Sequence, residues 1–77
     1  TQEAELLLPA LKDYLELAML LPPRPEFSHE ILAETNLKPL MNLQYHPDPR
    51  VRPLIEEILV KLLHRFSETG PGGGTSN

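Results

Sequence analysis

The clearest pattern in the chain is an apolar repeat in its last third. Large apolar side chains recur there at the i, i+3, i+4 and i+7 spacing that places them on one face of a helix. These residues are Val51, Leu54, Ile55, Ile58, Leu59, Leu62, Leu63 and Phe66. The oppositely charged pairs Arg52–Glu56 and Glu57–Lys61 stand four residues apart on the other face, where such pairs support a helix. The pattern predicts a helix over about residues 50–67.

A second apolar repeat opens the chain and is wider. Its main stripe consists of Leu8, Leu11, Leu15, Ala18 and Met19. A further row widens the stripe and consists of Leu7, Tyr14, Leu17 and Leu21. The repeat predicts a helix over about residues 4–21, in which Pro9 either stands at the first helical position or kinks an early turn. Because the combined stripe is wide for a helix of so small a domain, we expect the further row to be a candidate face for oligomerisation.

Prolines divide the middle of the chain. Pro22, Pro23 and Pro25 end the first helix and form a stiff connector. Ser28 is a candidate N-cap for a short second helix over residues 28–35. A third short helix is expected over residues 37–45, before the next pair of prolines.

The expected fold is all-α: a small compact bundle of four helices. It forms a single interaction domain over residues 1–67, because 77 residues are enough for one small core only. Glycine-rich residues 68–77 are expected to be a flexible linker or tail. The margin of stability of such a domain is narrow, so a docked partner is expected to increase it.

Charge and composition argue against several classes of function. The net charge is −4, and residues 1–37 hold seven acidic side chains against Lys12 and Arg24. A nucleic-acid-binding domain needs a basic face for the phosphates, so no nucleic acid is expected as a partner. No apolar run approaches the 18 residues of a membrane span, so no membrane is expected as a partner either. The chain has no cysteine and therefore no disulfide or thiolate site.

The sequence contains no arrangement of side chains that is typical of catalysis. His29, His46 and His64 have no His or Cys at the spacing of metal ligands, so structural roles are favoured for them. No glycine-rich phosphate loop precedes a helix, and no nucleophile stands beside a candidate base. We therefore expect no catalytic residue, no cofactor and no metal, and a protein that is not an enzyme.

The segment from His46 to Arg52 has two compatible interpretations. In the first it is a rigid corner, in which two prolines fix the turn, Asp48 caps the next helix and Val51 fills the corner. In the second it also presents Arg50 and Arg52 to an acidic partner.

Several residues of the second half carry a resemblance to a known family. They are Ile31-Leu32-Ala33-Glu34-Thr35, then Leu40, Leu43, His46, Asp48-Pro49 and Val51, and then the Leu- and Ile-rich last helix. With these, residues 31–66 resemble the N-terminal domain of transcription elongation factor S-II, whose relatives occur in elongin A and in the Mediator complex. The resemblance implies a four-helix bundle that binds short acidic–hydrophobic segments of other transcription proteins. It also implies an intracellular, nuclear location.

A second resemblance leads to a different expectation. Asp48, Val51 and Arg52, followed by a Leu-rich amphipathic helix, look like part of a HEAT or armadillo-like helical repeat. That resemblance implies a scaffold fragment whose neighbours bury its excess leucines. No second copy of the repeat is visible in the chain.

Our preferred hypothesis is a non-catalytic protein-interaction module that docks a short helical or linear segment of a partner beside the last helix. Its candidate groove and rim residues are Leu40, Leu43, Arg50, Arg52, Leu59 and Leu63, with Lys61 and Arg65 for acidic partners. The alternative is an oligomerisation or scaffold segment of a larger protein, self-associating through Leu7, Tyr14, Leu17 and Leu21.

Overall fold

The computed structural model describes residues 2–67 as a bundle of helices. Its elements are α1 (Gln2–Leu20), α2 (Pro25–Ile31), α3 (Glu34–Asn42), a 3-10 turn η1 (Leu43–Tyr45) and α4 (Val51–Phe66). The described part of the chain contains no β-strand. The predicted all-α fold with four helices is confirmed. The predicted flexible tail, residues 68–77, lies outside the described residues.

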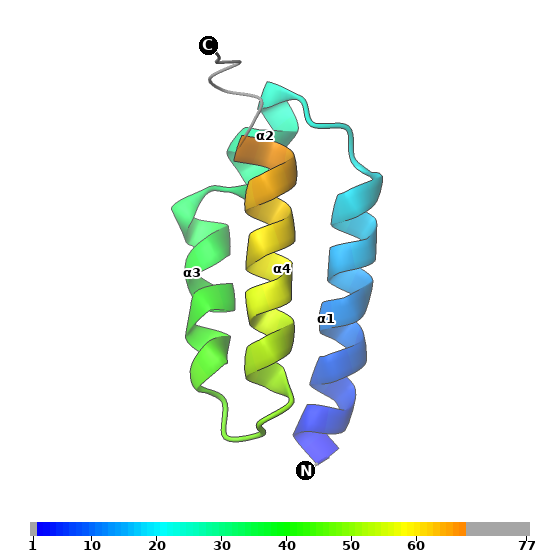
Figure 1. Ribbon diagram of the computed structural model, residues 1–77, viewed down its shortest axis with the longest axis vertical. Helices are drawn as coiled ribbons and strands as arrows, with labels where there is room; N and C mark the ends of the chain where they lie inside the picture. The colour runs from blue at the N-terminus through cyan, green and yellow to red at the C-terminus, as the bar shows by residue number, and fades with distance from the viewer. Residues whose placement is uncertain (1, 68–77) are drawn as a thin grey trace.

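The helices are arranged around α4. Figure 1 shows α1 along one side of α4 and α3 along the other. The first of these runs in the same direction as α4 and the second in the opposite direction, while short α2 lies near the end of α4. α1 packs mainly on α4, and α2, α3 and η1 pack on α4 and on one another. The bundle therefore has a central helix with two separate flanks.

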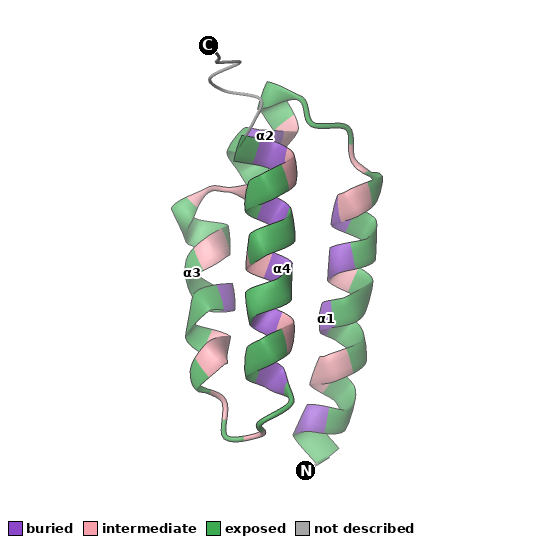
Figure 2. Ribbon diagram, in the orientation of Figure 1, coloured by how far each residue is buried: buried purple, intermediate pink, exposed green. Residues whose placement is uncertain are grey.

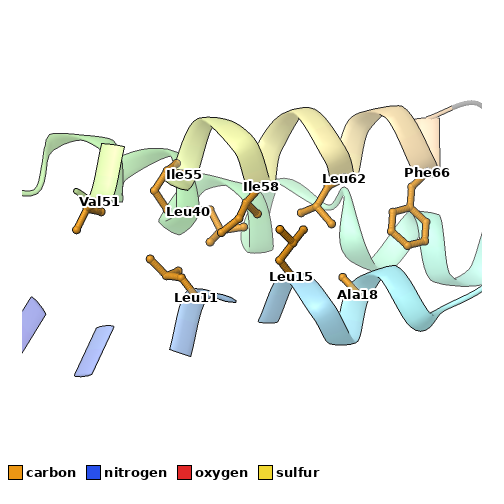
Figure 3. Packing of buried hydrophobic residues seen from close by; sticks show 9 residues of the cluster. All are labelled: Leu11, Leu15, Ala18, Leu40, Val51, Ile55, Ile58, Leu62 and Phe66. Atoms are coloured by element: carbon orange, nitrogen blue, oxygen red, sulfur yellow. The ribbon is translucent and has the colours of Figure 1, made fainter. Parts of the chain in front are cut away.

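The core is the apolar stripe of α4 together with what covers it. Its five residues on α4 are at most 1% exposed: Val51, Ile55, Ile58, Leu62 and Phe66. They meet Leu11, Leu15 and Ala18 of α1 and Leu40 of α3 (Figures 2 and 3). All four partners are less than 10% exposed. Because burial of an aliphatic or aromatic side chain contributes about 1.5–3 kcal/mol, α4 supplies the largest share of the core energy.

Proline chemistry sets the start of α2. Arg24 precedes Pro25 and is extended, with φ −100° and ψ 153°, because a residue before proline avoids the helical region. Pro25 then occupies the first turn, where its missing N–H costs nothing. The helix thus begins three residues before the expected N-cap, Ser28, whose side chain is buried inside it instead.

Two further prolines, Pro9 and Pro39, lie inside helices, and Pro53 lies in the first turn of α4. α1 runs through Pro9, which is exposed, so Pro9 does not stand at the first helical position. α3 runs through Pro39. Pro53 is the third residue of α4, where the backbone N–H has no intrahelical partner in any helix. It therefore removes no hydrogen bond from α4.

At the boundary between α2 and α3, the side chain of Asn36 bonds to the end of α2. Ala33 leaves the helical region, with φ −59° and ψ 140°, and the expected second helix, 28–35, is interrupted there. The Asn36 amide donates to the backbone oxygen of Glu30 at 2.6 Å. The same oxygen also accepts the backbone N–H of Ala33 at 3.3 Å, so the Asn36 side chain adds a second bond to a turn that the backbone already closes. The chain can therefore turn between the two helices without glycine or proline.

Removing one methyl group from the centre of the core tests the role of α4. Ile58 is completely buried, so Ile58→Val is expected to lower the free energy of unfolding by about 0.5–1.5 kcal/mol. The matched control is Val60→Ala on the same helix, where the side chain is 65% exposed and the change should stay within about 0.5 kcal/mol. Urea denaturation followed by circular dichroism measures both. Equal effects of the two changes would contradict a core centred on α4.

Candidate functional site

α1 carries apolar side chains that the core does not cover. Leu6 is 70% exposed, Leu17 65% and Leu20 78%. The buried stripe of α1 faces α4, and the periodicity of a helix places Leu6 and Leu17 on another flank of α1. A soluble domain of this size seldom leaves several leucines of one helix in water without a function for them.

Two hollows adjoin this flank of α1. The first, of about 360 Å³, is lined by Tyr14, Leu17, Ala18, Leu20, Leu21 and Ile31. The second, of about 440 Å³, is lined by Tyr14, Glu30, Ile31, Thr35, Asn36, Pro39 and Leu40. Tyr14 and Ile31 line both hollows, so the two adjoin each other, and together we call them the α1–α3 groove.

The α1–α3 groove follows from the arrangement of the bundle. α1 lies on one flank of α4 and the α2–α3 segment on the other, so the two walls are not packed closely on each other. The floor includes Ala18 of α1 and Leu40 of α3, which also belong to the core. The groove therefore reaches the edge of the core, and the walls above it are almost entirely apolar near α1.

Tyr14 joins the two halves of the groove. It is half-buried, and this burial raises the pKa of its phenol above the ordinary value, so the hydroxyl stays neutral at physiological pH. A tyrosine in this position offers a flat apolar surface and a polar tip, as at many protein interfaces.

Three of the four residues in the predicted oligomer face line the groove: Tyr14, Leu17 and Leu21. Leu7 is half-buried and is not part of the groove lining. Leu20, Ile31 and Pro39 were not among the expected site residues. Nothing in the sequence marks Ile31 of α2 and Pro39 of α3 as site residues, because a groove between distant segments is visible only once the fold is known.

The residues predicted for a site beside the last helix do not share one face. Two residues along a helix are about 200° apart, so Lys61 points away from both Leu59 and Leu63. Leu63 is 45% exposed and Leu59 half-buried on one side of α4. Of the two residues outside α4, Leu40 belongs to the core and Leu43 is half-buried in η1.

The predicted basic residues already have partners within the chain. Arg52 lies 3.2 Å from Glu56, and Lys61 lies 2.8 Å from Glu57. The Nε atom of Arg65 donates to the backbone oxygen of Leu21 at 2.9 Å. The exposed ion pairs of Arg52 and Lys61 are weak, so an acidic partner can still compete for these two cations.

A separate hollow of about 400 Å³ lies between the ends of α1 and α4. It is lined by Met19, Pro23, Val60, Lys61, His64 and Arg65. It contains two of the cations expected to meet acidic partners, but neither Leu59 nor Leu63. An acidic partner at this position stays a prediction from the sequence.

The corner before α4 is an ionic junction. Asp48 accepts bonds from the backbone N–H, the Nε and the guanidinium NH2 of Arg50 at 2.8–3.0 Å. Arg50 also reaches Glu5 of α1 at 2.9 Å. These contacts hold the pKa of the Asp48 carboxyl well below its usual range, chiefly through the side-chain bond from Arg50. They also hold the pKa of Arg50 above its ordinary value.

His46 completes the corner. Its Nδ1 accepts the backbone N–H of Asp48 at 3.0 Å, and its Nε2 lies 3.7 Å from a carboxylate oxygen of Glu3. Val51 behind the corner is fully buried. The geometry thus fits a rigid corner, with Arg50 in contacts inside the chain. The predicted cap is wrong: Arg50 and not Asp48 is the N-cap residue of α4, which has no side-chain cap bond, because Asp48 lies two residues earlier and accepts from the N–H of Arg50 instead.

Within residues 2–67, no group of three or more acidic or histidine side chains is placed to hold a metal ion. None of the helices in the same part of the chain is both long and apolar enough to cross a membrane. Comparisons of the chain with protein-family models, with curated proteins and with solved structures find no significant match. The resemblances to the S-II domain and to helical repeats therefore stay predictions from the sequence.

The junction between Asp48 and Arg50 predicts a stability difference that depends on pH. Asp48→Asn keeps an oxygen for the backbone N–H of Arg50 but removes the charge that the guanidinium binds. Because folding lowers the pKa of Asp48, its contribution is present above the ordinary value of 3.8 and is lost as the pH falls below it. The variant should melt at a lower temperature than the parent at pH 7, and the gap should narrow below about pH 4.

Thermal melts at pH 7 and at about pH 3 measure this difference. Glu56→Gln is the control, because it removes a carboxylate from an exposed pair of α4 without touching the corner. A gap for Asp48→Asn that is constant with pH would show that the charge of Asp48 does not stabilise the fold.

Proposed function

We propose that this chain is a non-catalytic protein-interaction module that docks an amphipathic helix of a partner protein in the α1–α3 groove. The observation that carries the proposal is the continuity of the groove with the core. Exposed Leu17 and Leu20 stand at one wall, and the nearly buried Ala18 and Leu40 form the floor. A side chain that enters the groove would thus be added to an existing core.

A helix suits this groove better than an extended segment. The exposed edges of α1 and α3 are helices whose backbone groups are already hydrogen-bonded, so they offer no strand edge for β-augmentation. A helix placed along them would lie on two neighbouring helices, as in a four-helix bundle. The α1-side residues that line the groove, from Tyr14 to Leu21, span about 10 Å at 1.5 Å per residue, so the groove covers about two turns of a partner helix.

Self-association is the second candidate function, and the exposed leucines favour it. Leu17 and Leu20 would be covered equally well by a second copy of α1 or by a neighbouring repeat of a scaffold. This candidate uses the face expected from the sequence, through Tyr14, Leu17 and Leu21. It predicts association that increases with concentration, whereas docking of a different protein predicts a monomer in its absence.

The resemblance of residues 31–66 to the S-II domain extends the proposal to a cellular process and a location. It supports a module of the transcription machinery, with a partner among transcription proteins and a nuclear location. The groove defined above is the part of this proposal that can be tested with the isolated chain.

A neutral probe peptide tests the docking function without any effect of charge. The probe is a designed amphipathic helix with Leu at i, i+3, i+4 and i+7 and with Gln and Ala elsewhere. It should shift the amide resonances of Tyr14, Leu17 and Ile31 in nuclear magnetic resonance spectra. Leu17→Asp should weaken its binding at least about tenfold, because a truncated or charged anchor commonly costs more than 1.4 kcal/mol.

Val60→Asp is the matched control, because Leu17 and Val60 are both 65% exposed and Val60 lies on α4 outside the groove. It should leave the binding of the neutral probe unchanged. Equal losses in the two variants would contradict docking at the groove. Sedimentation equilibrium of the chain alone decides the second candidate: a dimer that Leu17→Asp dissociates would put self-association first.

A further inference from the structure

The lips of the α1–α3 groove are acidic. Glu30 is the one charged residue among the residues that line the groove. On α1, Asp13 stands four residues before Leu17, so its carboxylate lies next to an exposed leucine of the groove wall, whereas Glu16 points about 160° away from Tyr14 and stands four residues after Lys12. All three carboxylates belong to exposed residues.

These carboxylates have no cationic partner within residues 2–67. The ion pairs of that part of the chain involve Glu3, Glu5, Glu34, Asp48, Glu56 and Glu57. Asp13, Glu16 and Glu30 are not among them, whereas Glu34 on α3 lies 3.8 Å from Lys38. The outer face of α4 is thus neutralised by pairing, while the lips of the groove keep their negative charge.

From this difference we infer that the groove selects a basic amphipathic helix: a segment with one apolar stripe flanked by Lys or Arg. The inference rests on the proposed docking function and adds the chemical class of the partner. Leucine-type side chains of the partner would enter between α1 and α3. Its cations would then meet Asp13 on one lip and Glu30 on the other, which is the arrangement of complementary potentials seen at specific interfaces.

The charge of the lips argues against the other occupants. Most homodimers are two-fold symmetric and bring the same patch of both copies together, so a second copy would place these carboxylates against each other. The chain's own residues 68–77 contain no Leu, Ile, Val, Met or Phe to fill the groove. An acidic–hydrophobic segment, which the resemblance to the S-II domain implies, would be repelled here.

The test compares two peptides that share the leucine stripe of the neutral probe. One carries Lys at the positions that flank the stripe and the other carries Glu. The Lys peptide should bind about tenfold more tightly at low salt, as expected of a few exposed ion pairs. This ratio should shrink towards one as the ionic strength rises to about 1 M, where charges are screened beyond about 3 Å. A scrambled Lys peptide without the apolar stripe should not bind.

A charge exchange on the lips should invert the preference. The double variant Asp13→Lys/Glu30→Lys is expected to bind the Glu peptide more tightly than the Lys peptide. The matched control is Glu56→Lys/Glu57→Lys, which changes the net charge by the same amount on the outer face of α4. The control should keep the original preference for Lys. Circular dichroism of each variant establishes that it is folded.

The outcomes separate the two proposals. Equal binding of the Lys and Glu peptides, both lost in Leu17→Asp, would overturn the basic partner and leave the docking function in place. Binding of the scrambled Lys peptide as tightly as the amphipathic one would also overturn it, because attraction to net charge would then suffice. If neither the neutral nor the charged helices bind, the docking function itself fails.

Discussion

The structure depends on one apolar stripe, that of α4. A small domain can bury little surface, and here five of the ten buried apolar residues of the described part of the chain lie on a single helix. Every other helix is held because it covers part of that stripe. The arrangement leaves α1 and α3 as separate neighbours of a common centre. The groove between them is a direct result. α4 packs on α1 at one side and on α3 at the other, and its side chains do not fill the space between α1 and α3.

The same constraint explains why Leu17 and Leu20 of α1 are exposed. α4 covers the stripe that contains Leu11, Leu15 and Ala18, and it has no further surface for Leu17 and Leu20. Exposed leucines cost little when they are single and scattered, but a row along one helix lowers solubility and invites association. In the proposed mode of docking, the acidic side chains beside the row would repel the same residues of a second copy and attract a partner of opposite charge.

The sequence predicts the fold well where a single repeat decides it. The helix of Val51 to Phe66 follows from uninterrupted spacing of apolar residues, and the prolines at 22, 23 and 25 mark the end of α1 and the start of α2. It predicts less well where a side chain acts at a distance along the chain. Ser28 has the chemistry of a cap but lies inside α2, and the turn after Ile31 gains a second bond from the amide of Asn36. The groove has the least signal, because Tyr14, Ile31 and Leu40 meet only after three helices have packed.

Two polar contacts at the ends of α1 and α4, one with the residue just before α4 and one with the residue just after α1, have a consequence for the alignment of these helices. Leucine-rich stripes with a spacing of three and four residues are degenerate, since sliding one helix by a turn of about 5.4 Å brings similar side chains back into contact. Glu5 meets Arg50 near one end of the pair, and the backbone of Leu21 accepts from Arg65 at the other. A slide of one turn would break both contacts at once. The leucines therefore supply adhesion, while these two arginines select one register among several that apolar packing alone would leave nearly equal in energy.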